Sequence, residues 1–282
     1  MSRLYEALQR MDTERRPPAA SATEPARTRE FLSDILTETV HTEERPSPKV
    51  ELSPGPRLVA LTDRQSLGAE KFRALATRLE NLRRQREIKS LQITSSVVGE
   101  GKTLVAGNLA ATIAAQSGSR VLLVEGDLQK PALTPLFGVT QLRGLSHWWS
   151  EQDENVAHYI YRTKDLPLWF LSAGTACDQP SQILGSARFA EAFACLAIGF
   201  DWIVVDSAPM LPTVTVNLWS RLLDGTLLVV REGIASVKYL KKGLEALDSP
   251  KLIGIVLNEA SEFRHARYPY YPQVSDKVLA KD

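Results

Sequence analysis

The sequence predicts an α/β protein in which helices cover both faces of a mostly parallel β-sheet. Short apolar runs rich in Val, Ile and Leu alternate with segments whose apolar residues recur at helical spacing. Strands of parallel sheets are buried on both faces and are therefore apolar throughout, and their alternation with helices is typical of three-layer α/β proteins. A glycine-bearing loop after the first strand and acidic residues at two later strand ends agree with this fold, because such sheets bind ligands at the carboxyl ends of their strands.

The folded part is expected to begin near Leu58. Apolar residues at helical spacing from Leu67 to Leu82 predict a helix with one buried face. A second helix is expected to end at Gly118, since glycine is favoured just beyond helix ends. Residues 144–149 are expected to lie in a looser stretch. The predicted strands cover residues 90–95, 120–125, 167–171, 202–206, 226–230 and 252–257, and the predicted helices cover residues 66–86, 102–117, 186–197 and 235–247.

Composition divides the chain into three parts. Residues 12–56 are rich in Pro, Glu, Arg, Thr and Ser and poor in apolar residues, which predicts a flexible tether. The apolar residues of segment 1–11 fall on one helical face, and so short a helix is marginal in water; it is a frayed terminus or a docking peptide. We expect a flexible N-terminal segment (1–56), a folded domain (57–262) and a C-terminal tail (263–282).

Overall composition excludes several classes of protein. The 282 residues carry a formal net charge of +1, so the chain lacks the basic excess of nucleic-acid-binding proteins. Cys177 and Cys195 are far apart and the histidines are scattered, a pattern that indicates neither a metal site nor a disulfide framework. No apolar run approaches the roughly 18 residues of a membrane span, and the N-terminus lacks a signal-peptide core. We expect a reduced cytoplasmic protein without a structural metal.

The first predicted strand runs into a loop that predicts a phosphate-binding site. Gly99 and Gly101 let backbone N–H groups turn inward, and the next helix adds the positive end of its dipole. Lys102 can reach the β and γ phosphates of a nucleotide, and Thr103 can ligate Mg²⁺. The strict P-loop pattern has glycine where this chain has Ser96, so only the relaxed pattern matches. The predicted nucleotide-binding residues here are Val98, Gly99, Glu100, Gly101, Lys102, Thr103 and Leu104.

Two other interpretations of this loop remain on the residues alone. One is a glycine-rich turn before an ordinary helix. The other is a dinucleotide-binding fingerprint, which is disfavoured because its third small residue would fall at Leu104.

Acidic residues at two later strand ends predict a magnesium site beside the loop. Asp206 ends one strand, and Glu125 and Asp127 lie at the end of another. In a parallel sheet these ends meet at the edge that carries the phosphate loop, so Asp206 is placed to hold Mg²⁺ through water. A single acidic residue after an apolar run is more often a helix cap or a solvated turn. Two of them beside a phosphate loop favour the metal site and a three-layer P-loop NTPase fold.

On these motifs the chain resembles the bacterial tyrosine autokinases of capsule and exopolysaccharide biosynthesis. The likeness covers roughly residues 57–260. Its phosphate loop ends Gly-Glu-Gly-Lys-Thr, as in that family, and the opening MSRLYEAL is similar to that of cytoplasmic members. The stretches that carry the resemblance are residues 66–73, 94–103, 121–131, 179–184, 200–209 and 224–231.

The resemblance implies a kinase that uses ATP and Mg²⁺ to phosphorylate tyrosines of its own C-terminal tail. Tyr268, Tyr270 and Tyr271 lie within four positions of this tail and are the predicted phosphoacceptors. A Pro-Tyr surface turn, or tyrosines packed on the domain edge, is the structural alternative. Tyr159, Tyr161 and Tyr239 lie among apolar residues and are predicted to be packing residues.

The resemblance also implies partners. Family members form homo-oligomers in which the tail of one subunit enters the site of the next. They act with a membrane-spanning polysaccharide chain-length regulator or co-polymerase. We therefore expect a cytoplasmic protein held at the inner face of the membrane through such a partner.

The resemblance assigns catalytic roles to Lys102, Glu125, Asp127 and Asp206. Lys102 and the loop amides would neutralise charge on the β and γ phosphates. Thr103, with Asp127 and Asp206 through water, would position Mg²⁺. Glu125 would orient or deprotonate the acceptor hydroxyl, and positioning should contribute more than proton removal because the pKa of free tyrosine is near 10.

Two residues near the last strands keep alternative roles. Asn258 follows the final predicted strand and either touches the nucleotide base or caps the strand end. Arg231 pairs either with phosphate or with an acidic surface.

Departures from the family pattern motivate two rival hypotheses. Glu125 stands where the family has Asp, Gln129 where it has Arg, and Ala76 where its helix motif has a second Arg. One methylene moves a carboxylate by about 1 Å, and such an error can slow a reaction roughly a hundredfold. The second hypothesis is therefore a catalytically weakened, nucleotide-binding regulatory subunit. The third, a partitioning-type ATPase, is disfavoured because residues 95–97 lack the extra lysine of those proteins.

Overall fold

The structure is a computed structural model that describes residues 54–139, 142–211, 214–234, 236–247 and 251–260. The predicted tether lies outside these residues except for its last three positions. The predicted docking helix over residues 1–11 and the tail tyrosines Tyr268, Tyr270 and Tyr271 also lie outside them.

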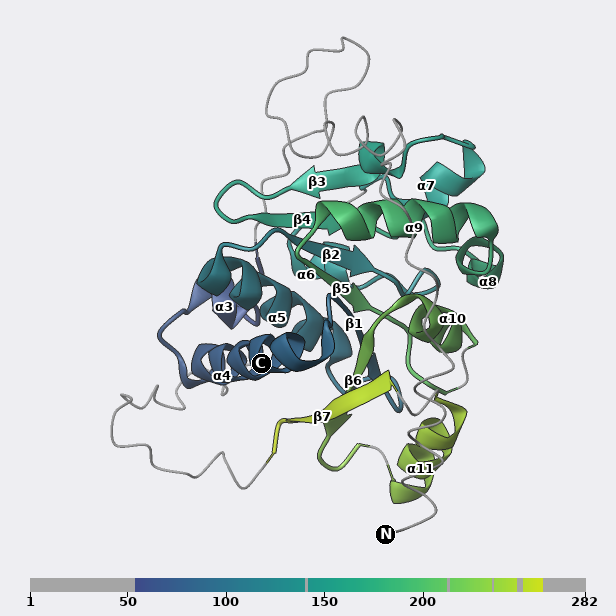
Figure 1. Ribbon diagram of the computed structural model, residues 1–282. Coiled ribbons are helices and arrows are strands. Elements are labelled where there is room, and N and C mark those ends of the chain that lie inside the picture. The colour runs from purple at the N-terminus through teal and green to yellow at the C-terminus, as the bar shows by residue number, and fades with distance from the viewer. Residues whose placement is uncertain (1–53, 140–141, 212–213, 235, 248–250, 261–282) are drawn as a thin grey trace, which may run out of the picture.

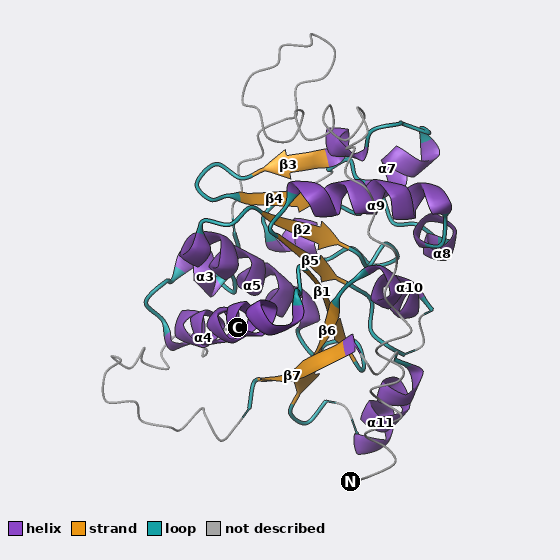
Figure 2. Cartoon of the chain, viewed as in Figure 1, coloured by secondary structure: helices purple, strands orange, loops and turns teal. Residues whose placement is uncertain are grey.

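A twisted seven-stranded sheet forms the centre of the described part (Figures 1 and 2). Its strands lie in the order β3-β4-β2-β5-β1-β6-β7. All neighbouring strands are parallel except β3 and β4, which are antiparallel. The predicted mostly parallel α/β fold is thereby confirmed. The strands are β1 (Ser90–Ser95), β2 (Val121–Glu125), β3 (Ile160–Arg162), β4 (Leu168–Leu171), β5 (Trp202–Asp206), β6 (Gly225–Arg231) and β7 (Leu252–Asn258).

Helices cover both faces of the sheet. In Figure 1, α3, α4 and α5 gather on one side of it, and α8, α9 and α10 gather on the other. None of the described helices combines the length and the apolar character that crossing a membrane requires. The helices are α3 (Val59–Thr62), α4 (Leu67–Arg86), α5 (Lys102–Ser117), α6 (Leu133–Leu136), α7 (Leu145–Ser150), the 3₁₀ helix η1 (Val156–Tyr159), α8 (Pro180–Leu184), α9 (Ala187–Gly199), α10 (Thr215–Leu222) and α11 (Val237–Ala246).

Alternate side chains of the central strands build a separate core on each face. Leu123 of β2 packs with residues of α4 and α5, whereas Leu122 and Val124 pack with residues of α7, α9 and α10. Successive side chains of a strand point to opposite faces, so a strand buried on both sides must be apolar at every position. This is why these strands are continuous apolar runs in the sequence.

Local signals set the ends of the two helices before and after β1. The Ser66 hydroxyl accepts a hydrogen bond from the Ala69 N–H at 3.2 Å and caps α4. Helix α5 ends at Gly118, whose φ of 63° lies in the left-handed region, as predicted. Both helices therefore lie where the sequence places them.

Several predictions from the sequence need correction. Residues 145–150 form α7 rather than a looser stretch, because Leu145 and Trp148 are buried against the second core. Tyr159 and Tyr161 are buried as predicted, but Tyr239 is 52% exposed and is no packing residue. Strand β3 and the short helices carry too few residues for a periodic signal.

Close packing at Gly126 connects the second core to the end of β2. A Cβ atom at Gly126 would lie 2.6 Å from Val205 Cγ1 and 3.0 Å from Trp219 Nε1. Trp219 is fully buried, packs edge-on against Phe189 and donates a hydrogen bond to the Gly126 carbonyl at 3.1 Å. This glycine therefore lets Trp219 fix the backbone just after Glu125.

Gly126→Ala should destabilise the fold by about 1–3 kcal/mol, because the new methyl group overpacks a closed core. Gly254→Ala is the matched control, since its Cβ would meet Leu227 Cδ2 at an ordinary 3.4 Å. Urea unfolding followed by tryptophan fluorescence measures both free energies of unfolding. Equal losses in the two variants would contradict the proposed importance of the Trp219 contact.

Candidate functional site

The predicted phosphate loop and acidic residues meet at the carboxyl edge of the sheet. Strand β1 pairs with β5 on one side, and β5 pairs with β2 on its other side. In this register Glu125 lies opposite Asp206, and Asp206 lies opposite Ile93. The sheet therefore places both strand-end acids next to the loop that follows β1.

The loop has the backbone shape that phosphate binding requires. Gly99 and Gly101 have φ values of 92° and 91°, a region that residues with a Cβ rarely adopt. Gly101 is the N-cap of α5, and Lys102 is the first helical residue. The free N–H groups of this helix start, together with its dipole, favour an anion at the loop.

Buried polar contacts hold the loop from behind. The Glu100 carboxylate is fully buried and accepts hydrogen bonds from the Ser96 hydroxyl at 2.7 Å and the Val97 N–H at 2.9 Å. The Asn258 amide donates to the Glu100 carbonyl at 2.9 Å. Arg231 contacts the Gly99 carbonyl at 3.4 Å and pairs with Glu259 at 2.5 Å. The loop is therefore shaped before any ligand binds.

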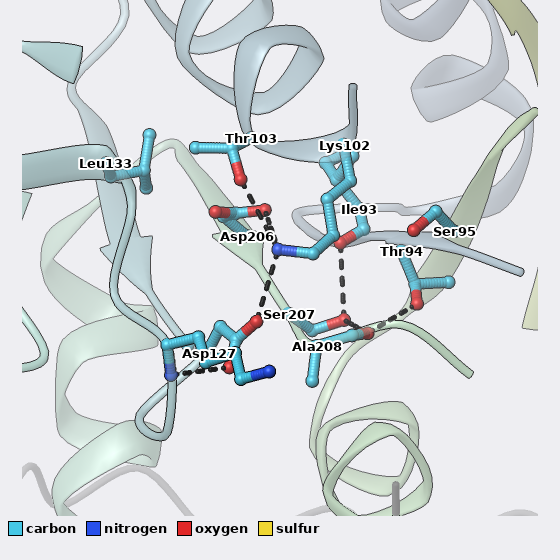
Figure 3. Close-up of polar contacts among 12 residues, drawn as sticks. Ile93, Thr94, Ser95, Lys102, Thr103, Asp127, Leu133, Asp206, Ser207 and Ala208 are labelled. Carbon is cyan, nitrogen blue, oxygen red and sulfur yellow. Dashed lines mark hydrogen bonds and ion pairs between the residues drawn. The ribbon is translucent and has the colours of Figure 1, made fainter. Parts of the chain in front are cut away.

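A lysine lies between two acids at the centre of the site. Lys102 Nζ is 3.3 Å from Asp127 Oδ2 and 3.5 Å from Asp206 Oδ1, and it also donates to the Thr103 hydroxyl at 3.3 Å. Figure 3 shows the lysine pointing between the two carboxylates. All three charged side chains are largely buried. The structure thus brings together Lys102, Thr103, Asp127 and Asp206, as their strand-end positions predict.

Asp206 is the most deeply buried charged side chain of this group. It is fully buried, and its carboxylate faces the Lys102 ammonium at 3.5 Å and the Thr103 hydroxyl. Burial raises the pKa of Asp206 to about 6, against the opposing effect of the neighbouring Lys102 ammonium. Full burial of a carboxylate is costly even beside a cation, and a pKa raised in this way makes Asp206 a candidate ligand-binding group.

These residues fit a magnesium ion held mainly by a nucleotide. Mg²⁺ is usually bound by one or two carboxylates together with substrate phosphates and water. Asp206 offers a buried carboxylate, and Asp127 and Thr103 lie beside the same lysine. The described residues contain no group of three or more His, Cys, Asp or Glu side chains that could hold a metal alone. Phosphate oxygens would therefore have to complete the coordination.

The environment of Glu125 differs from that predicted for a catalytic base. Its carboxylate is fully buried. One oxygen accepts hydrogen bonds from the Leu133 and Thr134 N–H groups, and the other accepts from the Thr134 and Ser172 hydroxyls and the Ala173 N–H. No oxygen is left to receive a tyrosine hydroxyl. The structure thus does not support the predicted role of Glu125 in orienting or deprotonating the acceptor.

The structure adds residues that sequence reasoning missed. Glu100 is predicted to bind the nucleotide, and its buried side chain instead holds the loop through Ser96 and Val97. Ser172 directly follows strand β4 at the same edge of the sheet, a position that could have marked it. The Asn258 side chain is engaged by the loop carbonyl, and its contact with a nucleotide base stays a prediction.

Comparisons with known proteins agree with this geometry. No protein-family model matches the sequence. The tyrosine-protein kinase YwqD of Bacillus subtilis is 29% identical over 216 residues, which cover 76% of this chain and 90% of that protein. The putative tyrosine-protein kinase CapB of Staphylococcus aureus is 31% identical over 206 residues, which cover 72% of this chain and 89% of CapB. The succinoglycan biosynthesis transport protein ExoP of Rhizobium meliloti is 31% identical, but only 28% of its length is covered.

Solved structures show the same pattern. The chimerical protein CapA2B2 superposes with a TM-score of 0.67 at 27% identity, covering 74% of this chain and 93% of that one. The cell division ATPase MinD of Pyrococcus furiosus has a TM-score of 0.52 at 25% identity, covering 62% of this chain and 73% of that one. CapA2B2 is thus more similar to this chain than the ATPase MinD.

Asp206→Asn should stabilise the nucleotide-free protein at pH 7.5 and remove the effect of magnesium on nucleotide affinity. Because the pKa of Asp206 is raised from 3.8 to about 6, protonation stabilises the fold below about pH 4, and this stabilisation is lost as pH rises through 6. The amide side chain of the variant does not ionise, so the variant does not lose stability when the pH rises. We expect a gain of about 1–3 kcal/mol at pH 7.5 and a smaller gain at pH 4.5.

Urea unfolding at the two pH values checks this expectation, with Asp165→Asn as the control at an exposed carboxylate. Lower stability of Asp206→Asn at pH 7.5 would mean that the lost attraction to Lys102 outweighs the relief of burial.

Proposed function

Since this chain belongs to the bacterial tyrosine-protein kinases of capsule and exopolysaccharide biosynthesis, we propose that it transfers the γ-phosphoryl group of ATP to tyrosines of its own C-terminal tail. Family membership makes the chain a protein-tyrosine kinase with a nucleotide-binding site. One observation carries the assignment of the site. Lys102, Asp127 and the buried Asp206 converge beside a phosphate loop that the protein's own contacts hold in shape.

The loop binds and orients the triphosphate in the proposed reaction. N–H groups around Gly101 and the start of α5 point at the phosphates. Lys102 exchanges its two carboxylate partners for phosphate oxygens and stabilises the charge that develops during transfer. Glu100 and Asn258 hold the loop so that little reorganisation is needed. Bound Mg²⁺ would supply positive charge near the transferred group, with Thr103, Asp127 and Asp206 as the residues that hold it.

Asp127 is the acid best placed to meet the acceptor tyrosine. One of its oxygens accepts a hydrogen bond from the Lys130 N–H at 3.1 Å, and the other lies 3.3 Å from Lys102 Nζ. Asp127 is slightly exposed, whereas Glu125 is fully buried. Tyrosine has a pKa near 10 in water, so the main contribution of an acid here is to orient the hydroxyl in line with the phosphate. We propose Tyr268, Tyr270 and Tyr271 as the acceptors because they cluster in the tail after β7.

A membrane-spanning partner remains part of the proposal. This chain corresponds to 28% of the length of ExoP, so that relative joins a similar domain to much additional protein. We propose that a separate chain-length regulator or co-polymerase provides the corresponding part here and holds the kinase at the inner face of the membrane.

Lys102→Met should reduce tyrosine phosphorylation at least a hundredfold, because it removes the cation that faces the β and γ phosphates. The full chain is incubated with Mg-ATP, alone and with membranes containing the partner, and phosphotyrosines are mapped. Lys238→Met, at an exposed lysine of α11, is the control and should leave the rate unchanged. Modification that persists in Lys102→Met would contradict the assigned site.

Replacing Tyr268, Tyr270 and Tyr271 together by Phe should remove the phosphotyrosine signal without changing ADP affinity. Tyr239→Phe is the matched control at an exposed tyrosine of the folded domain. Mg-ADP binding without phosphotyrosine in the unmodified chain would instead support the weakened regulatory subunit. Release of phosphate without phosphotyrosine would support the partitioning-type ATPase.

A further inference from the structure

The buried Glu125 carboxylate accepts as many hydrogen bonds as its geometry allows. The distances are 2.7 Å to the Leu133 N–H, 3.0 Å to the Thr134 N–H and 2.7 Å to the Thr134 hydroxyl. Ser172 and Ala173 add a hydroxyl at 3.2 Å and an N–H at 3.1 Å. A carboxylate has about four lone-pair sites, and these five donors occupy both oxygens.

The donors come from two segments that are far apart in the sequence. Leu133 and Thr134 begin helix α6, whereas Ser172 and Ala173 follow strand β4. The Thr134 and Ser172 hydroxyls also lie 3.1 Å from each other, and both side chains are buried. We call Glu125, Thr134 and Ser172 the carboxylate clamp. It joins the ends of β2 and β4 to the start of α6.

This clamp closes the loop that carries Asp127. Residues 126–132 connect Glu125 to Leu133, and the bond between these two residues fixes both ends of the loop. The Gly126 N–H donates to the Asp206 carbonyl at 2.8 Å. The Gly126 carbonyl accepts from Trp219 at 3.1 Å. The backbone next to Asp127 is therefore fixed by the two hydrogen bonds of Gly126 and by the bond that joins Glu125 to Leu133.

We propose that Glu125 is a positioning residue, which sets the distance of Asp127 from Lys102 and Asp206 through the carboxylate clamp. This inference rests on the proposed function, because it concerns the acids of that site. Polar groups that hold the residues around a metal commonly change its affinity by about 10–100-fold when they are removed.

The length of the Glu125 side chain follows from this role. Aspartate at this position would be shorter by one methylene, which moves the carboxylate by about 1 Å. Its oxygens would then lie beyond hydrogen-bond distance of some of the donors, which now sit at 2.7–3.2 Å. Glu125→Asp should therefore weaken the site of this chain rather than improve it, although the family has aspartate here.

The test uses full-length Glu125→Asp, Glu125→Gln, Thr134→Val and Ser172→Ala. Thr163→Val is the matched control, since the hydroxyl of this buried threonine donates to the Leu166 carbonyl, away from the clamp. Calorimetry measures ADP affinity with and without Mg²⁺ for each variant. We expect the gain in ADP affinity on adding Mg²⁺ to fall about tenfold in the clamp variants, with Mg²⁺-free affinity unchanged because the phosphate loop is intact.

The rate of tyrosine phosphorylation against pH separates positioning from proton transfer. A positioning role predicts that Glu125→Gln, Thr134→Val and Ser172→Ala lower the rate in parallel and keep the shape of the pH profile. A base role predicts that Glu125→Gln alone loses the rate and alters the profile. That result, or a Glu125→Asp variant equal to or faster than the parent, would overturn the proposal.

Two features keep the outcomes distinct. If Glu125→Gln does not fold, Thr134→Val and Ser172→Ala still test whether the clamp positions Asp127, because they leave the Glu125 carboxylate in place. If the unmodified chain binds Mg-ADP but makes no phosphotyrosine, the proposed kinase reaction fails, while the ADP measurements still test the clamp. Clamp variants with the same Mg²⁺ response as Thr163→Val would refute it.

Discussion

The site depends on one electrostatic arrangement, in which the Lys102 ammonium lies between the carboxylates of Asp127 and Asp206 at the carboxyl edge of the sheet. Burial of Asp206 would be unfavourable without this neighbour, since an isolated ion in the interior carries a large desolvation cost. The order of β2, β5 and β1 brings the three groups together. The two apolar cores keep these strands in register, so the packing of the whole domain supports a small charged centre.

The phosphate loop and its supports form a second level of organisation. The loop has left-handed backbone at Gly99 and Gly101, which glycine adopts without steric cost but at the loss of its conformational freedom, so contacts must hold the loop in this one shape. Glu100 and Asn258 do this from inside the protein. The polar side chains near the site thus have two roles. Asp127 and Asp206 face the proposed ligand, whereas Glu100 and Asn258 hold the backbone of the loop.

The sequence predicts the residues that face the ligand better than the residues that support them. Lys102, Asp127 and Asp206 could be predicted to meet because the loop after β1 and the ends of the parallel strands β2 and β5 share one edge of the sheet. The buried environment of Glu125 could not be predicted, because a strand-end acid looks the same in sequence whether it points to solvent or into the interior. Its donors, Thr134 and Ser172, come from distant segments, and no local pattern encodes such a meeting. Residues 145–150 illustrate the same limit, since burial of Trp148 rather than periodicity makes them helical.

The ammonium group of Lys102 has a consequence for the order in which ligands assemble. It occupies the space between the two acids that a divalent cation would need, and like charges repel strongly where water is scarce. Free Mg²⁺ therefore has to compete with the Lys102 ammonium for the carboxylates of Asp127 and Asp206. A cation that arrives chelated to a triphosphate brings along the anionic groups that draw the lysine away. Nucleotide and metal should accordingly enter as one complex, and until they do the lysine offsets one of the two carboxylate charges.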